Sequence, residues 1–136
     1  MLKAAYKHLD TTLRAIDDVN TGINGQIYRD IAPSGAAMPY CVINLNNGGM
    51  TNGAIRFNEG DTLWTVKFVG LQAQHATAMR GWVGQVFDAM HETMPGVVDD
   101  WYLFLVTCET VVEYVERDGD VVYLHTGANY RVRLSK

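Results

Sequence analysis

Residues 63 to 71 read LWTVKFVGL, and this stretch decides the fold. Its apolar Trp64, Val66 and Phe68 alternate with Thr65 and Lys67, a period of two that is typical of a strand with one buried face. The next apolar residues recur instead at steps of three and four, which predicts an amphipathic helix; they are Met79, Trp82, Val83, Val86, Phe87, Met90 and Met94. Pro95-Gly96 is expected to end that helix, so the centre of the chain is a strand followed by a helix.

The chain before this stretch predicts one more helix and one more strand. A first amphipathic helix of four to five turns is indicated by the same spacing in Leu2, Tyr6, Leu9, Leu13 and Ile16, and it should end near DVNTGINGQ. Residues 40 to 45 form a short apolar run, expected to be a strand antiparallel to residues 63 to 71. Residues 46 to 62, NNGGMTNGAIRFNEGDT, are rich in Gly and Asn, and we expect a projecting loop or β-arm there.

The chain after the central helix predicts three or four further strands. Asp118-Gly119 should form a type I′ turn of a hairpin, and the final NYRVRL should place Tyr130, Val132 and Leu134 inward. The run WYLFLVT, residues 101 to 107, is apolar on both faces, with Trp101, Leu103 and Leu105 on one face and Tyr102, Phe104 and Val106 on the other. Both of its faces should therefore be covered, either because the sheet curls or because a second copy packs on it. We predict one α+β domain over residues 1–136, an antiparallel sheet with two helices packed on one face.

Composition and motifs argue against most kinds of chemistry. The formal charge of −4 disfavours a general nucleic-acid binder, and Cys41 and Cys108 each lie in an apolar run, which favours buried thiols over a disulfide. The four histidines, His8, His75, His91 and His125, have no metal-site spacing and are expected to be solvated. No GK[ST] phosphate loop, Gly-x-Ser-x-Gly elbow or membrane-length apolar run occurs. We expect no catalytic residue, no cofactor, no metal site and no membrane association.

Residues 27 to 45, IYRDIAPSGAAMPYCVINL, contain a Pro-bounded interruption that needs an explanation. Pro33 and Pro39 each lack a backbone donor and hold φ near −65°, so the segment between the first helix and the strand at Tyr40 should be a stiff, extended crossing. Small residues such as Gly35 would let another subunit approach closely. An ordinary surface loop is the alternative.

The order of these features resembles the tail terminator, or tail completion, proteins of long-tailed phages. The likeness covers nearly the whole chain: a first amphipathic helix, the segment with Tyr28, Pro33 and Pro39-Tyr40, a long Gly-rich connection, the WTVKFVG strand, a second helix and a closing hairpin with YRVRL. The Gly-rich connection is longer than that pattern leads us to expect.

The resemblance implies a structural virion protein and no enzyme. It implies a homo-hexameric ring at the head-proximal end of the tail, assembled in the host cytoplasm, that caps the tail tube and joins it to the head connector or stopper protein. DNA would pass through this ring without specific binding. The expected contact residues are Pro33, Gly35, Pro39 and Tyr40, together with Ile55, Arg56 and Phe57, whose apolar-charged-apolar pattern suits a short added strand.

Two other interpretations of the sequence stay open. One is a different head-to-tail joining protein, a stopper or an adaptor. The other is a small α+β ligand-binding or enzymatic domain with its pocket between the sheet and the second helix.

Overall fold

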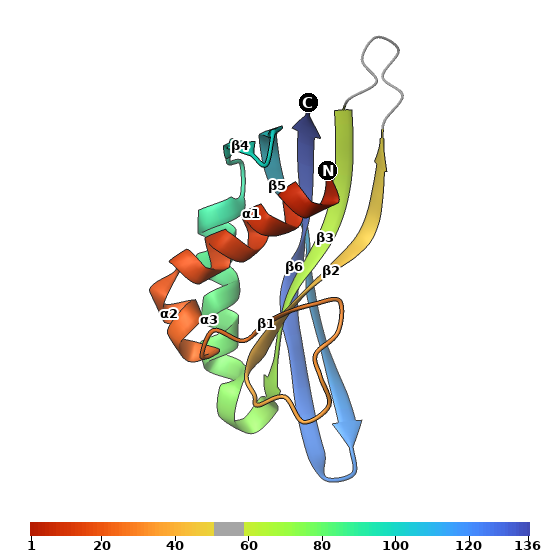
Figure 1. Cartoon of the computed structure of the whole chain (residues 1–136). Coiled ribbons are helices and arrows are strands. Elements are labelled where there is room, and N and C mark those ends of the chain that lie inside the picture. Colours follow the sequence, from red (N-terminus) through yellow and green to blue (C-terminus); the bar gives the residue numbers. More distant parts are fainter. Residues whose placement is uncertain (51–58) are drawn as a thin grey trace.

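The fold combines one six-stranded sheet with three helices (Figure 1). In this computed structural model, residues 1–50 and 59–136 are described. The elements, in chain order, are α1 (Leu2–Ala15), α2 (Asp17–Gly22), β1 (Ile27–Arg29), β2 (Tyr40–Met50), β3 (Glu59–Leu71), α3 (Gln72–Met90), β4 (Gly96–Val98), β5 (Trp101–Asp118) and β6 (Val121–Ser135). The strand order across the sheet is β1-β2-β3-β6-β5-β4.

The sheet is mostly antiparallel, with one parallel pair at its edge. The expected antiparallel pairing of residues 40 to 45 with residues 63 to 71 is confirmed, since Cys41 lies opposite Phe68 and Ile43 opposite Val66. The short β1, which the sequence analysis did not predict, runs parallel to β2. The sheet is therefore mixed, and the α+β class is confirmed while a purely antiparallel sheet is wrong.

Several strands are longer than the sequence patterns suggested. β2 and β3 stay paired out to Met50 and Gly60, so the expected strand over residues 40 to 45 was too short. The apolar runs after residue 100 form only two long strands, β5 and β6, beside the short β4. β5 continues through β-bulges at Phe104 and Glu109 instead of turning, because neither site has Gly or Pro to reverse the chain.

The bulge at Phe104 also changes which side chains share a face of β5. Leu103 and Val106 are both fully buried, although strict alternation would put them on opposite faces. Trp101 is only partly buried, and Tyr102 is exposed. The predicted division of WYLFLVT into two covered faces is therefore wrong.

The helices differ from the prediction in number and in length. The first helix ends at Ala15, and residues Asp17–Gly22 form a separate short helix where a turn was expected. α3 begins directly after β3, where the Leu71 N–H donates to Nδ1 of His75, and it ends at Met90. Met94 is 75% exposed, because the chain leaves the helix before reaching Pro95.

The core lies between the helices and the inward side chains of the four longest strands. The even-numbered residues of β3 point into it: the Trp64 ring lies 6.1 Å from that of Tyr6 on α1, and the Phe68 ring lies 5.4 Å from that of Trp82 on α3. Tyr130, Val132 and Leu134 are buried as predicted. Burial of these large side chains supplies most of the stabilisation, at about 25 cal/mol per Å² of apolar area.

Two turns differ from their expected geometry. The tip of the β5–β6 hairpin is Gly119-Asp120, with φ of +60° at Gly119 alone, which fits a type II′ turn and not the predicted type I′ turn. The type I′ pattern of two positive φ angles occurs at Asp99-Asp100, between β4 and β5.

Candidate functional site: assembly surfaces

The β2–β3 and β5–β6 strand pairs extend to opposite ends of the molecule (Figure 1). At one end the β2–β3 pair runs beyond the helices, near both chain termini. At the other end is the turn of the β5–β6 hairpin. Ile55, Arg56 and Phe57, three of the expected contact residues, lie outside the described residues.

The segment between β1 and β2 is a folded loop and not an extended crossing. The Ala36 N–H donates to the Pro33 carbonyl at 3.1 Å, and Gly35 has φ of +78°, so residues 33 to 36 form a type II turn. Glycine permits this positive φ, which is why the chain reverses here despite Pro33. The prediction of a stiff extended crossing is therefore wrong, although Pro33 and Gly35 are exposed as a contact surface requires.

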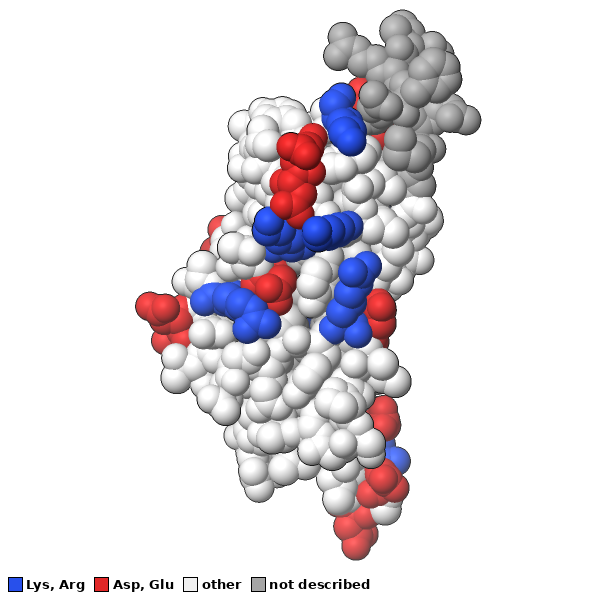
Figure 2. All heavy atoms as spheres, in the orientation of Figure 1, with Lys and Arg blue, Asp and Glu red and all other residues white. Residues whose placement is uncertain are grey.

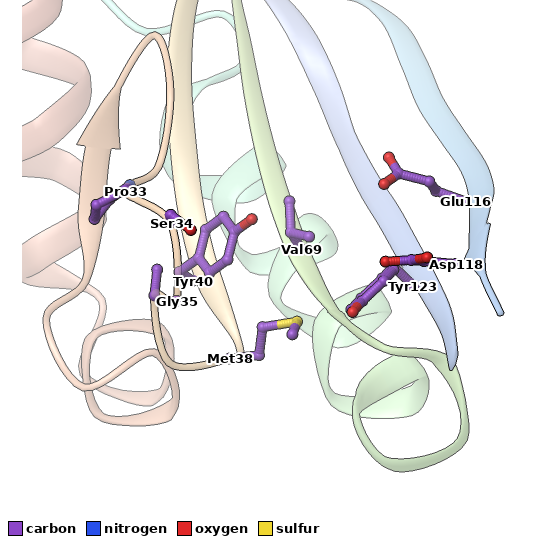
Figure 3. A pocket seen from close by; sticks show the side chains of 10 residues that line it. Pro33, Ser34, Gly35, Met38, Tyr40, Val69, Glu116, Asp118 and Tyr123 are labelled. Atoms are coloured by element: carbon purple, nitrogen blue, oxygen red, sulfur yellow. The ribbon is translucent and has the colours of Figure 1, made fainter. Parts of the chain in front are cut away.

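This loop forms one wall of a hollow with a volume of about 350 Å³ (Figure 3). The other walls are β2, β3 and the distal part of the β5–β6 hairpin. Its lining residues are Pro33, Ser34, Gly35, Ala36, Met38, Tyr40, Val69, Glu116, Asp118 and Tyr123. Three of the four expected contact residues in the described part of this segment thus share one hollow, and the fourth, Pro39, is half-buried beside it.

The hollow combines phenol rings with carboxylates. Figure 3 shows Glu116 and Asp118 reaching from β5 toward it, with Tyr40 and Tyr123 along its length. The Tyr40 and Tyr28 rings form a T-shaped pair, with a centroid distance of 5.7 Å. Burial raises the pKa of the Tyr40 phenol, and the nearby charge of Glu116 raises it further. Tyr40 therefore stays neutral in a partly desolvated and negatively charged environment.

His125 lies on β6, opposite Val69 of β3, and contacts Glu116, two residues that line this hollow. Its Nε2 is 3.2 Å from Glu116 Oε2, and its ring stacks on the Tyr114 ring with centroids 4.4 Å apart. Burial, with the charge of Lys67, lowers the pKa of His125, so the ring is neutral at pH 7. The expectation that this histidine is solvated is wrong, because β6 lies inside the sheet and His125 is buried there.

The outward face of the sheet is polar, although the sequence suggested that a curled sheet or a second copy of the chain must cover it. A chain of hydrogen bonds crosses β2, β3, β6 and β5: Asn46 Nδ2 donates to Thr65 Oγ1, Thr65 Oγ1 to Asn129 Oδ1, and Asn129 Nδ2 to Thr110 Oγ1. Next to it, Arg131 bridges Asp61 and Glu109. Polar side chains that are hydrogen-bonded to one another can face water, so this face of the sheet does not need to be covered by helices or by another subunit.

Negative charge gathers on the β5–β6 hairpin. Residues 109–120 contain five carboxylates and one arginine, a net charge of −4 that equals the formal charge of the whole chain, so the remaining residues sum to zero. Figure 2 shows acidic side chains clustered at the end of the molecule where this hairpin turns. The contacts of these carboxylates differ: Glu109 pairs with Arg131 and Glu113 with Arg80, whereas no Lys or Arg of the described chain pairs with Glu116 or Asp118.

The same hairpin also exposes apolar side chains. Val111 is 71% exposed and Val115 is 50% exposed, and Tyr114 and Val121 are exposed as well. A second hollow of about 460 Å³ lies between the start of α3 and the hairpin tip, lined by Leu71, Gln72, Ala73, Gln74, Asp120, Val121 and Val122. Exposed apolar side chains that lie together on one element are one mark of a surface that meets another protein.

Metal-ligating groups, disulfides and membrane-spanning helices can be checked directly over the described residues. Over residues 1–50 and 59–136, no three potential metal-ligating side chains come together. Cys41 is buried and Cys108 partly buried, and both are free thiols. None of the described helices has the length and hydrophobicity needed to cross a membrane.

Comparison with known proteins identifies structural relatives but no sequence family. No family model matches the chain, and no curated protein matches it. A solved chain from the virion of the native gene transfer agent (GTA) particle is 15% identical, with a TM-score of 0.69; the match covers 94% of this chain and 92% of that chain. A second solved structure is 9% identical, with a TM-score of 0.63, over 98% of this chain and 92% of its own. At these identities the comparisons show a shared fold.

Proposed function

We propose that this chain is a structural virion protein of a phage-like particle, a tail terminator whose copies form a hexameric ring. The observation that carries the proposal is the fold it shares with a GTA virion chain over nearly the full length of both proteins. The order of elements that resembles the tail terminator family supports the same role. In this role the ring caps the tail tube, joins it to the head connector or stopper, and lets DNA pass.

The surfaces of the chain suit such an assembly. A ring needs two different complementary surfaces on each copy, and this molecule extends strand pairs at two opposite ends. We assign subunit contacts to the loop that contains Pro33, Gly35, Pro39 and Tyr40. We assign the contact with the tail tube, or with an adjacent subunit, to Ile55, Arg56 and Phe57.

Charge fits the passage of DNA through the ring. Six copies would carry a formal charge of about −24, and negative walls repel the DNA phosphates. We therefore expect purified protein not to retard duplex DNA at physiological salt. Retardation would contradict the role as an open conduit.

Native mass spectrometry and negative-stain electron microscopy of the purified protein test the ring. We expect a six-fold species and annular particles with an open centre. Particles made without this protein should carry tails of uncontrolled length that are not joined to heads. A strictly monomeric protein, with normal tails in its absence, would contradict the proposal.

Another head-to-tail joining protein, a stopper or an adaptor, is the second candidate. It is favoured by the same virion neighbour, because the shared fold does not separate the positions within a particle. Tails that reach normal length but stay unjoined to heads would select this candidate over the terminator.

A further inference from the structure

Each edge of the sheet is covered along only part of its length. β1 pairs with residues 41–43 of β2, and β4 pairs with residues 101–103 of β5. Among the described residues, no strand pairs with the outer side of residues 44–50, which we call the β2 edge, or of residues 109–118, which we call the β5 edge. The two edges lie at opposite ends of the molecule (Figure 1). Unpaired strand edges of this kind are templates for another strand.

The backbone of β5 shows where its cover ends. The Val106 N–H donates to the Thr93 carbonyl at 2.9 Å, and the Cys108 N–H donates to Nδ1 of His91 at 3.0 Å. Beyond the bulge at Glu109, β5 pairs with β6 without interruption, so every second residue turns its N–H and C=O away from β6. By this alternation, the outward backbone groups of the β5 edge belong to Val111, Glu113, Val115 and Arg117.

The β2 edge offers the same kind of backbone groups. The Ile43 carbonyl accepts from the Asp30 N–H at 2.9 Å, which shows that Ile43 turns its backbone toward β1. β1 ends there, and the pairing of β2 with β3 shifts at a bulge between Leu45 and Asn47. Counted through this bulge, the outward backbone groups of the β2 edge belong to Leu45, Gly48 and Met50.

Apolar side chains accompany the free backbone groups of the β5 edge. Val111 and Val115 lie opposite Ala128 and Leu124 of β6, which are buried, yet both valines are largely exposed. An added strand would hydrogen-bond to the backbone of β5 and would cover these two valines. Backbone bonds and side-chain cover are the two contributions by which a strand binds at a sheet edge.

Charge decides which strand can add to the β5 edge. Residues 109–120 carry a net charge of −4, so two β5 edges placed side by side would repel one another. The β2 edge contains no Asp, Glu, Lys or Arg. Its Asn47 and Gly48 are exposed, so they can be reached by another subunit. Of the two edges that a second copy offers, the β2 edge is therefore the compatible one.

The strand directions also match. β2 is antiparallel to β3, β3 to β6 and β6 to β5, so β2 and β5 of one chain run in opposite directions. Two copies in the same orientation would therefore place the β2 edge of one antiparallel to the β5 edge of the other, with their helices on the same side of the joined sheet. Because these edges lie at opposite ends, the neighbour is displaced along the strands, as the tilted strands of a closed barrel are.

We propose that the β5 edge binds the β2 edge of a neighbouring copy of this chain and joins the two sheets into one. The contact is heterologous, because two different edges meet, so each added copy leaves one edge of each kind free until the assembly closes. The inference rests on the proposed ring for this closure, and it adds to that ring the contact that links its subunits.

Removing one outward N–H from each edge tests the contact. Val115→Pro and Gly48→Pro each remove a donor at an edge position, where proline is compatible with a strand. Val115→Ala and Gly48→Ala are the matched controls that keep the donor, and alanine at position 48 adds the same Cβ, 3.1 Å from Leu2 Cδ2. By analytical ultracentrifugation, each proline variant should need a concentration about tenfold higher or more than its control to assemble. Equal assembly of each proline variant and its control would overturn the proposal.

Mixing the two proline variants tests whether different edges meet. Val115→Pro keeps an intact β2 edge and Gly48→Pro keeps an intact β5 edge, so one intact contact forms between them and no further copy can add. Native mass spectrometry should show a 1:1 heterodimer at a concentration where each variant alone is monomeric. Recovery of no complex from two folded variants, or of larger assemblies, would overturn the pairing of these edges.

Hydrogen exchange of the wild type gives a test that does not depend on the folding of a variant. Assembly should slow exchange of the amides of Glu113 and Val115 about tenfold or more, whereas the Tyr114 amide, which faces β6, should exchange at the same rate in the dilute monomer and in the assembly. Unchanged exchange at Glu113 and Val115 would overturn the proposal.

The same measurements separate this contact from the ring. A hexameric wild type whose proline variants are also hexameric would overturn the edge contact and leave the ring standing. Open chains of wild-type copies that the proline variants abolish would support the edge contact and contradict the closed ring. A wild type that stays monomeric at every concentration would overturn both.

Discussion

β5 and β6 pass through two regions with opposite environments. Between Trp101 and Cys108 the strands lie over the core, where Leu103 and Val106 are fully buried. From Glu109 onward β5 carries valines of the same kind, yet Val111 and Val115 are exposed and alternate with carboxylates. Apolar residues therefore stabilise the fold in the first region and are available for contact with another protein in the second.

The largest expected effect is a difference in the free energy of unfolding between two variants, each of which places one aspartate in one of these regions. Leu103→Asp should unfold the protein, because an unpaired carboxylate in a dry site costs several kcal/mol, a large share of the stability of a small domain. Val111→Asp should change the free energy of unfolding by less than about 1 kcal/mol, because the side chain is already in water. Urea unfolding followed by tryptophan fluorescence measures both. An equal loss of unfolding free energy in both variants would contradict the difference between the buried and the exposed region of β5.

Gly127 marks the close approach of β6 to β3, next to the start of the distal hairpin. A Cβ at this position would lie 2.0 Å from the Val66 carbonyl oxygen, and a backbone atom cannot move aside cheaply. We expect Gly127→Ala to destabilise the protein by about 1–3 kcal/mol. Gly84→Ala is the matched control, since a Cβ there meets nothing and should stabilise α3 slightly. Similar melting temperatures for the two variants would contradict the close approach.

Lower pH should weaken the native state through two histidines. Burial lowers the pKa of His8 and of His125 below the ordinary value of 6.5, so the unfolded chain binds protons more readily than the native protein. Stability is therefore full above about pH 6.5 and falls as the pH decreases through the folded-state pKa values. Urea midpoints measured between pH 8 and pH 5 should decline, and His125→Asn should flatten the decline. An increase in stability over this range would contradict the burial of these rings.

The smallest expected effect concerns the ion pairs on the outward face. Arg131 lowers the pKa of Glu109, so this contact stabilises the protein above the ordinary carboxyl range and is lost as the pH falls through it. The pair is partly exposed, which limits its contribution to at most about 1 kcal/mol. Arg131→Met should lower the melting temperature at low salt more than at 1 M salt. If the melting temperature falls by the same amount at low salt and at 1 M salt, the arginine stabilises the protein through packing of its aliphatic stem instead.

The residues between β2 and β3 allow a functional counterpart to these stability tests. Replacing residues 51–58 by a short Gly-Ser link leaves both described strands intact, so the monomer should fold with unchanged circular dichroism. If Ile55, Arg56 and Phe57 contact the tail tube, tails should then fail to be capped or joined. Normal infectious particles would show that this segment only connects two strands.

Local patterns in the sequence determined the elements whose signals depend on nearby residues alone. The period of two in residues 63 to 71 predicted β3 and its buried face, the repeat from Met79 to Met90 predicted α3, and the alternation at Tyr130, Val132 and Leu134 predicted the inward face of β6. These patterns persist because side-chain direction follows from backbone geometry without reference to distant contacts.

The tertiary structure decided what depends on partners distant in the chain. The bulge at Phe104 shifts the register of β5 against β6, and it places Val106 on the same face as Leu103. The hollow joins residues 33–40 to Glu116, Asp118 and Tyr123, which are about eighty residues later in the sequence. His125 is buried because β6 lies between β3 and β5, a position that the strand order sets. The burial of His125 and the geometry of the hollow depend on neighbours in space that are distant in the chain, so no local pattern in the sequence specified them.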